Sequence, residues 1–400
     1  MSRSAQRAGT PLDPTGRPEG RGPDEPERAA RRCAAVNATL AVRHRTLLPH
    51  VLALLYGLAI AFASLQPFAP WIPPEAGTSF WLAAPWPPRY TRFDVVANVV
   101  AYVPFGLFVS LTPQRAAPRM RALLALAAGF ALSFALETLQ AYLPPRDASA
   151  IDAAANAAGA LAGGIAGAAL ARSYRVRQKL SAARHRVFLG GRLGDVGLAL
   201  LVVWIVAQIN PGIPLFAVTL DQEPALRGAA AVAPAPDTAA TLIEAAGTAL
   251  QLTGVGLFLA LLLRDRRFVG GAVLLLVGAA LLAKGGAAML LLKPAAWETW
   301  LKPGVSVGMA GGLLALLFVV FLPRPAQVAT CAVALLASLL LPLVAGDVPP
   351  ARAPVTLFNW RYGHLLNFNG LTQTVLLVWP ILAAAWLFAL AGRPAWGAPE

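Results

Sequence analysis

Long apolar segments alternate with short polar segments along the chain from residue 47 onward. Most of the apolar segments approach 20 residues, the length that an α-helix needs to cross a lipid bilayer. A β-barrel would instead show segments of about ten residues with alternating hydrophobicity. The pattern predicts an all-α polytopic membrane bundle of about ten transmembrane helices, at residues 47–65, 93–111, 122–143, 149–171, 193–209, 242–263, 268–292, 304–322, 328–345 and 372–391.

Composition and charge support this class. Of the 400 residues, 57% are hydrophobic and only 13% are charged, whereas a soluble globular chain carries about 25% charged residues. The formal net charge is +14, but the basic residues lie mostly between apolar segments, where they set the topology. We therefore expect no nucleic-acid partner.

The two ends of the chain are predicted to be cytoplasmic. Residues 1–46 are rich in Pro, Gly and Arg and lack apolar periodicity, which predicts a disordered basic tail. Because a long polar stretch precedes the first apolar segment, residues 47–65 are interpreted as an uncleaved signal anchor.

With the N-terminus inside, most Lys and Arg residues fall in inner loops, and residues 393–400 form a second cytoplasmic tail. The predicted location is the cytoplasmic (inner) membrane.

Polar residues divide the membrane part into two. The first four predicted spans carry nearly all the intramembrane polar residues. We therefore expect a four-helix domain at residues 47–171, a basic cytoplasmic loop at 172–192 and a six-helix extension at 193–392. In the extension Lys284 has no obvious acidic partner. Pairing with Glu244 and snorkelling toward the headgroups are two options, and the sequence leaves the residue unassigned.

The second span carries a polar stripe. Asp94, Asn98 and Tyr102 recur every four residues, so they lie on one helix face. Pro104 follows and is expected to kink or loosen that helix.

The third and fourth spans carry matching polar groups. Glu137 and Gln140 lie on one face of the third span, Arg146 follows in the turn, and Asp152 and Asn156 share a face of the fourth. A charged side chain at mid-bilayer costs roughly 2.5 to 3.5 kcal/mol on insertion scales. Because the expected threading places all these groups near the outer leaflet, we predict one outward-facing polar pocket.

Small residues favour close packing of the fourth span. Gly159, Gly163 and Gly167 repeat every four residues, a seam that lets helix backbones approach closely. The polar groups on this helix are therefore expected to face protein rather than lipid.

Several of these residues also have a purely structural interpretation. Asp152 or Ser149 can cap the fourth span, and Asp94 can cap the second. Arg146 can anchor at the lipid headgroups or pair with Glu137 or Asp152. The sequence alone leaves these alternatives open.

No cofactor or metal is expected. The four histidines are scattered and show no metal-ligand spacing. Cys33 lies in the polar tail and Cys331 in an apolar segment, so no structural disulfide is expected either.

Four short motifs in this order resemble the VanZ-like family over about residues 47–171. They read S-L-Q-P-F (64–68), D-V-V-A-N-V-V-A-Y-V-P-F-G (94–106), E-T-L-Q-A-Y-L-P-P-R (137–146) and D-A-A-A-N-A-A-G (152–159). The family is named for a teicoplanin-resistance membrane protein. The resemblance implies a helical membrane domain with a role in the bacterial envelope and raises a link to glycopeptide antibiotic resistance, without assigning that resistance to this chain.

Three functional hypotheses follow. In the first, a non-enzymatic protein binds a lipid headgroup, a cell-wall or surface-polysaccharide precursor, or a glycopeptide, with Arg146 on its phosphate or carboxylate. In the second, a membrane enzyme acts on a lipid-linked envelope precursor, with Glu137 and Asp152 as candidate acid and base. The third is a transporter, which the sparse polar groups in the inner halves of the first four spans disfavour. Membrane lipids are the expected partners in each case.

Overall fold

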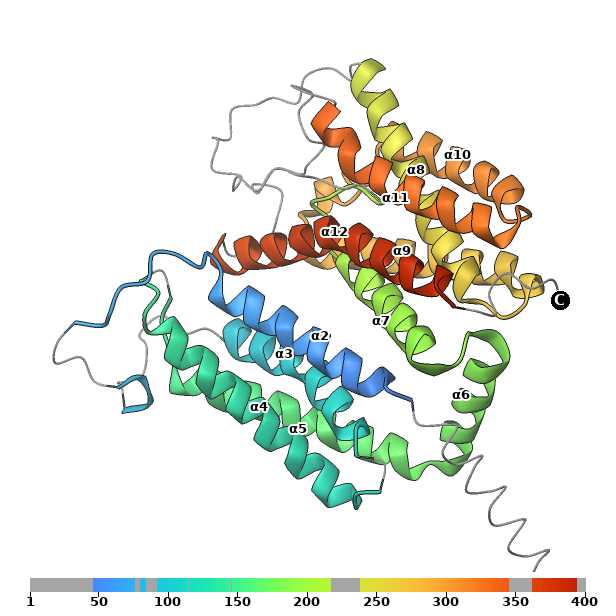
Figure 1. Cartoon of the computed structure of the whole chain (residues 1–400). Helices are drawn as coiled ribbons and strands as arrows, with labels where there is room; N and C mark the ends of the chain where they lie inside the picture. Colours follow the sequence, from blue (N-terminus) through green and yellow to red (C-terminus); the bar gives the residue numbers. More distant parts are fainter. Residues whose placement is uncertain are drawn as a thin grey trace, which may run out of the picture. The chain divides into compact units, whose positions relative to one another are not determined.

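The computed structural model describes residues 46–75, 80–83, 92–113, 115–144, 146–216, 238–344 and 362–393. Within these ranges the chain folds into α-helices and short 3-10 helices and has no β-strand, so the predicted all-α class is confirmed (Figure 1). The predicted tail at residues 1–46 lies outside the described residues except for its last residue. The first five helices are α2 (Leu48–Leu65), α3 (Arg92–Leu111), α4 (Pro118–Gln140), α5 (Ala150–Arg172) and α6 (Tyr174–Val187).

The second half of the chain supplies six further helices in the described part. They are α7 (Gly191–Ala207), α8 (Thr238–Leu262), α9 (Val269–Leu291), α10 (Pro303–Val319), α11 (Arg324–Val344) and α12 (Tyr362–Ala391). Three 3-10 helices lie at Trp81–Ala83, Arg266–Phe268 and Pro294–Ala296, and the first of them is η1.

Most of these helices can cross a membrane. Eight helices of the described part are long and apolar enough to do so. The predicted spans at 193–209 and 304–322 correspond to α7 and α10, which have 17 residues each, the lower end of the usual range for a span. A polytopic membrane protein is therefore supported, while the orientation of its ends stays a prediction.

The first bundle, α2 to α5, is organised around α5, which packs against both α3 and α4 (Figure 1). Glycines let the backbones of α3 and α5 touch. A Cβ added to Gly163 would lie 2.0 Å from the Val103 carbonyl oxygen, and one added to Gly106 would lie 2.0 Å from the Ala160 carbonyl oxygen. These distances are too short for any side chain, so the glycine seam is a helix-packing surface.

Helix α3 continues through Pro104 without a break. A proline removes a backbone donor and disturbs the carbonyl groups of the preceding turn. The Tyr56 hydroxyl of α2 donates to the Ala101 carbonyl oxygen at 2.9 Å. This bond satisfies an acceptor in the turn that the proline weakens.

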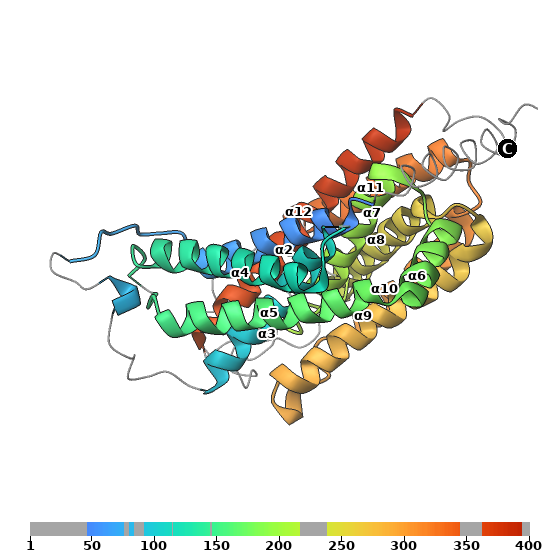
Figure 2. The ribbon, with the colours of Figure 1, turned by 90° about the horizontal axis from the view of Figure 1, so that it is seen from below.

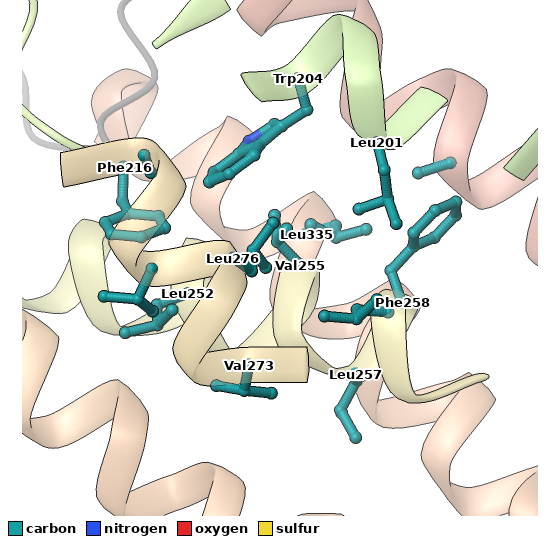
Figure 3. Packing of buried hydrophobic residues seen from close by; sticks show 14 of the residues in the cluster. Leu201, Trp204, Phe216, Leu252, Val255, Leu257, Phe258, Val273, Leu276 and Leu335 are labelled. Atoms are coloured by element: carbon teal, nitrogen blue, oxygen red, sulfur yellow. The ribbon is translucent and has the colours of Figure 1, made fainter. Parts of the chain in front are cut away.

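The second bundle has its own core. Helix α8 packs against α10 and α11, and large side chains from several helices meet around it, as Figure 3 shows. Trp204, Phe216 and Phe258 are fully buried in this cluster. A separate and smaller cluster around Tyr102 and Phe105 fills the first bundle.

The two bundles join along α2, α7 and α12, which contact one another; Figure 2 shows these three helices from a second direction. Asp195 of α7, which is only 2% exposed, accepts a hydrogen bond from the Leu47 backbone N–H at 2.7 Å. It also forms an ion pair with Arg184 of α6. One buried carboxylate of α7 therefore binds both the residue before α2 and the last turn of α6.

The segment 172–192, predicted as a basic loop, contains the helix α6. Its Ala, Arg, Lys, Gln and Leu residues are strong helix formers, which explains why a polar connection becomes helical. None of its side chains is buried. Tyr174 and Leu180 remain 69% and 57% exposed.

Neither interpretation of Lys284 is correct. Its side chain is 1% exposed, and its ammonium group donates to the carbonyl oxygens of Asn210 and Ile213, both at 2.8 Å. Glu244 instead faces Lys302 at 3.9 Å. The buried segment that follows α7 supplies backbone acceptors for the lysine, so it neither pairs with an acid nor snorkels.

The Gly163→Ala variant tests the backbone contact between α3 and α5. The added methyl group would overlap the Val103 carbonyl oxygen, 2.0 Å away, so we expect a loss of about 1 to 3 kcal/mol in unfolding free energy. Thermal unfolding of the detergent-purified protein measures it.

Gly278→Ala in α9 is the matched control. Nothing lies within 4 Å of a Cβ at Gly278, so this change should leave stability unchanged or raise it by up to about 1 kcal/mol. Equal melting temperatures for the two variants would contradict the close contact.

Candidate functional site

Polar side chains from three helices meet between the first half of α3, the second half of α4 and the start of α5. Asn98 of α3 donates a hydrogen bond from its amide to the Asp152 carboxylate of α5. Both side chains are half-buried. Asp94 lies one helical turn before Asn98, within the first turn of α3.

A second contact crosses all three helices at the level of Tyr102. The Asn156 amide donates to the Ser133 hydroxyl of α4 at 2.9 Å, and Tyr102 of α3 lies beside Ser133. Tyr102 is 3% exposed and Asn156 is 6% exposed. The Asn156 side-chain oxygen is buried and has no partner among the described residues, although buried acceptors usually have one.

Glu137 connects α4 to the start of α5. Its carboxylate accepts the Ser149 backbone N–H at 2.8 Å, and only 4% of the residue is exposed. The Ser149 hydroxyl in turn caps α5 by accepting the Ile151 N–H at 3.2 Å. Ser149 rather than Asp152 is therefore the cap, and Asp152 lies in the first turn, where the helix dipole favours a carboxylate.

Asp94 is not a cap either. Helix α3 begins at Arg92, so Asp94 lies inside its first turn rather than before it. Both first-turn carboxylates are thus stabilised by a helix dipole, and the capping interpretation of each is wrong.

Two charged neighbours act on Glu137 from a distance. Asp152 repels its carboxylate, whereas Arg146 attracts it. Burial lowers the pKa of the Arg146 guanidinium, and Glu137 acts in the opposite direction. The site therefore holds two carboxyl groups and one half-buried cation within electrostatic reach of one another.

The last two candidate residues face the end of α2. Gln140 donates from its amide to the Ser64 carbonyl oxygen at 2.9 Å. Arg146 donates from Nη2 to the carbonyl oxygens of Ala63 and Gln66, both at 2.9 Å, and from Nε to that of Gln66 at 3.2 Å. A cation is favourable there because helix carbonyls carry partial negative charge at the C-terminus. Arg146 thus clamps α2, which neither sequence interpretation of this residue foresaw.

We define the polar cluster as the side chains that meet between α3, α4 and α5: Asn98, Tyr102, Ser133, Glu137, Asp152 and Asn156. Two hydrogen bonds join members of the cluster, and the Ser149 backbone N–H binds Glu137, so the sequence motifs describe a packed polar network. Among the described residues, no three His, Cys, Asp or Glu side chains are placed to hold a metal ion.

Sequence reasoning missed two members of this region. Ser133 precedes Glu137 by one helical turn on the same face of α4, and that spacing was a usable signal. Trp81 of η1 has no sequence pattern that would have indicated its place near this region. Its indole donates to the Thr138 hydroxyl at 3.3 Å, and its ring packs 5.4 Å from that of Phe134, which fastens the loop after α2 onto α4 beside Glu137.

One comparison with known proteins gives a match. Residues 42–171 match the family model described as VanZ/LLP1. This segment contains α2 to α5 and the whole polar cluster, and α6 to α12 lie outside it. No curated protein and no solved structure matches the chain.

The Arg146→Lys variant tests the clamp on α2. An ammonium group keeps the charge but cannot reproduce the planar fork that reaches both Ala63 and Gln66. We expect a loss of about 1 to 3 kcal/mol in stability from the carbonyl left without a donor. Thermal unfolding of the purified protein is the readout.

The exposed Arg186 of α6 provides the control. An Arg186→Lys change removes no hydrogen bond between described residues, so its melting temperature should match that of the wild type. If Arg146→Lys also melts like the wild type, the clamp does not stabilise the fold.

Proposed function

Because residues 42–171 form a VanZ-like domain, we propose that this membrane protein acts in the bacterial cell envelope, in the cytoplasmic membrane. Its polar cluster, together with Arg146, binds the polar part of a lipid headgroup or of a lipid-linked cell-wall or surface-polysaccharide precursor. In this proposal the ligand enters from the outer side, which the charge bias of the loops favours as the location of the cluster.

The observation that carries this proposal is the convergence of costly groups. Two carboxylates and two amides from three neighbouring helices lie between spans that are otherwise apolar. Ionisable residues inside a membrane protein are expensive and usually mark a function. A purely structural network would serve packing equally well with neutral groups.

The donor and acceptor inventory favours a particular ligand chemistry. Among the described residues the Asn156 oxygen lacks a donor, and the Glu137 carboxylate has more acceptor sites than the Ser149 backbone N–H fills. Sugar hydroxyls and peptide N–H groups are donors of the required kind. The cluster therefore suits a glycan or peptide rather than an apolar molecule.

Arg146 supplies the complementary charge. Its hydrogen bonds to the end of α2 use Nε and Nη2, which leaves Nη1 available among the described residues. Guanidinium groups bind phosphate and carboxylate strongly. A ligand that joins a phosphate to a sugar or peptide would satisfy Arg146 and the acceptors at the same time.

Binding by the full-length protein in nanodiscs tests the proposal, with a fluorescent polyprenyl-pyrophosphate-linked sugar as the probe. Asp152→Asn, Glu137→Gln and Arg146→Ala should each weaken binding about tenfold or more, because each removes a charge-assisted contact. A glycopeptide antibiotic serves as a second probe, which the family resemblance motivates.

Asp265→Asn is the matched control, because Asp265 is an exposed carboxylate that pairs with Arg267 in the second bundle. Its binding should equal that of the wild type. Wild-type affinity in all three variants would show that neither the cluster nor Arg146 is the site.

An enzyme acting on the same kind of precursor is the second candidate. The observation that favours it is the electrostatic contact between Glu137 and Asp152, because two interacting carboxyl groups can share acid and base roles. The nanodisc assay separates the two functions. Product formation that Glu137→Gln abolishes while binding persists supports the enzyme, whereas binding without turnover supports the binding protein.

A further inference from the structure

A second group of charged side chains lies at the opposite end of the first bundle. Arg115, Arg121, Arg172 and Arg177 line a cavity of about 210 Å³ between the start of α4, the end of α5 and α6. On α4, Arg121 and Glu137 are separated by about 24 Å, given the rise of an α-helix. This basic cavity is therefore distinct from the polar cluster.

The cavity has a strong excess of positive charge. Its other lining residues are Ala116, Pro118, Ala168 and Ala171, so none of the lining residues is acidic. Arg177 lies close enough to Arg121 to repel it electrostatically. Several guanidinium groups around one cavity repel one another unless an anion lies between them.

Two of the four arginines, Arg121 and Arg177, are held by backbone carbonyl groups rather than by acidic residues of the lining. Arg121 is only 6% exposed, and it donates from Nε to the Ala116 carbonyl oxygen at 3.0 Å and from Nη1 to that of Ser110 at 2.8 Å. Arg177 donates to the Ala171 carbonyl oxygen at 3.1 Å. Such fixed positions reduce the entropy lost when a ligand binds.

The start of α4 adds to the positive potential. The helix begins at Pro118, and Ala117 before it offers no side-chain cap. The first-turn N–H groups of such a helix carry partial positive charge and favour anions. The helix end and the arginines therefore act on the same space.

We propose that Arg115, Arg121, Arg172 and Arg177 form a binding site for a phosphate group. Guanidinium groups recognise phosphate through paired, charge-assisted hydrogen bonds. The phosphate is carried either by the headgroup of an anionic phospholipid or by a soluble phosphate ester, and both place the same group in the cavity.

Helix α6 favours the lipid as the carrier. It leaves Tyr174 and Leu180 largely exposed among the basic residues Arg175, Lys179 and Arg186. A basic helix with exposed apolar side chains is typical of a segment that lies on an anionic membrane surface. A headgroup in the adjacent leaflet can then reach the cavity from the side of α6.

Native mass spectrometry of the full-length protein tests the site, after purification from nanodiscs that contain phosphatidylcholine with or without phosphatidylglycerol. Wild-type protein should retain phosphatidylglycerol. The double variant Arg172→Ala/Arg177→Ala should retain it about tenfold less, because two charge-assisted contacts are lost. Arg121 is left intact because it also binds the Ser110 carbonyl oxygen.

Arg175→Ala is the control, because Arg175 is exposed on the same helix and does not line the cavity. A parallel titration adds inorganic phosphate and glycerol phosphate. Displacement of the retained lipid by either one supports the phosphate site and shows that a soluble carrier also fits, whereas retention of the lipid at high phosphate assigns the site to the headgroup.

Two results would overturn the proposal. One is equal retention of phosphatidylglycerol by the double variant and the wild type. The other is an equal loss of retention in Arg175→Ala, which would indicate general charge attraction to the membrane surface. Neither result depends on the polar cluster, whose residues are unchanged in these variants.

Discussion

The backbone contact between α3 and α5 is the constraint on which the first bundle depends. Glycines at Gly106 and Gly163 remove the side chains that would otherwise separate the two helices. At this separation the short side chains of Asn98 and Asp152 can reach each other across the interface. The polar cluster thus depends on the small-residue seam, because close packing of the helices lets short polar side chains hydrogen-bond between apolar spans.

This network also explains how buried charge is tolerated. Glu137 receives the backbone N–H of Ser149, and Arg146 donates to the carbonyl groups that end α2. Backbone N–H and carbonyl groups at helix ends have no partner within their own helix. The charged side chains of Glu137 and Arg146 supply hydrogen-bond partners for such groups. The Asn156 oxygen has no hydrogen-bond partner among the described residues. A ligand donor at that position would complete the network.

Periodic features were predictable from the sequence, and long-range contacts were not. The four-residue spacing of Asp94, Asn98 and Tyr102 places them on one face whatever surrounds the helix. By contrast, Arg146 points to α2 because of how a turn and a distant helix end pack together. Lys284 likewise donates to carbonyl groups of the segment after α7, about 70 residues away in the sequence. No local sequence pattern predicts a contact over that distance.

The contact between Asn98 of α3 and Asp152 of α5 is expected in the native membrane. Cysteine cross-linking tests it most directly, in a chain whose Cys33 and Cys331 are replaced by serine. With Asn98→Cys and Asp152→Cys, a short thiol reagent should join the two positions rapidly within one chain. The pair Asn98→Cys and Ala169→Cys should react far more slowly, because Ala169 lies about 25 Å farther along α5 than Asp152. Equal rates for the two pairs, or no cross-link at all, would contradict the account.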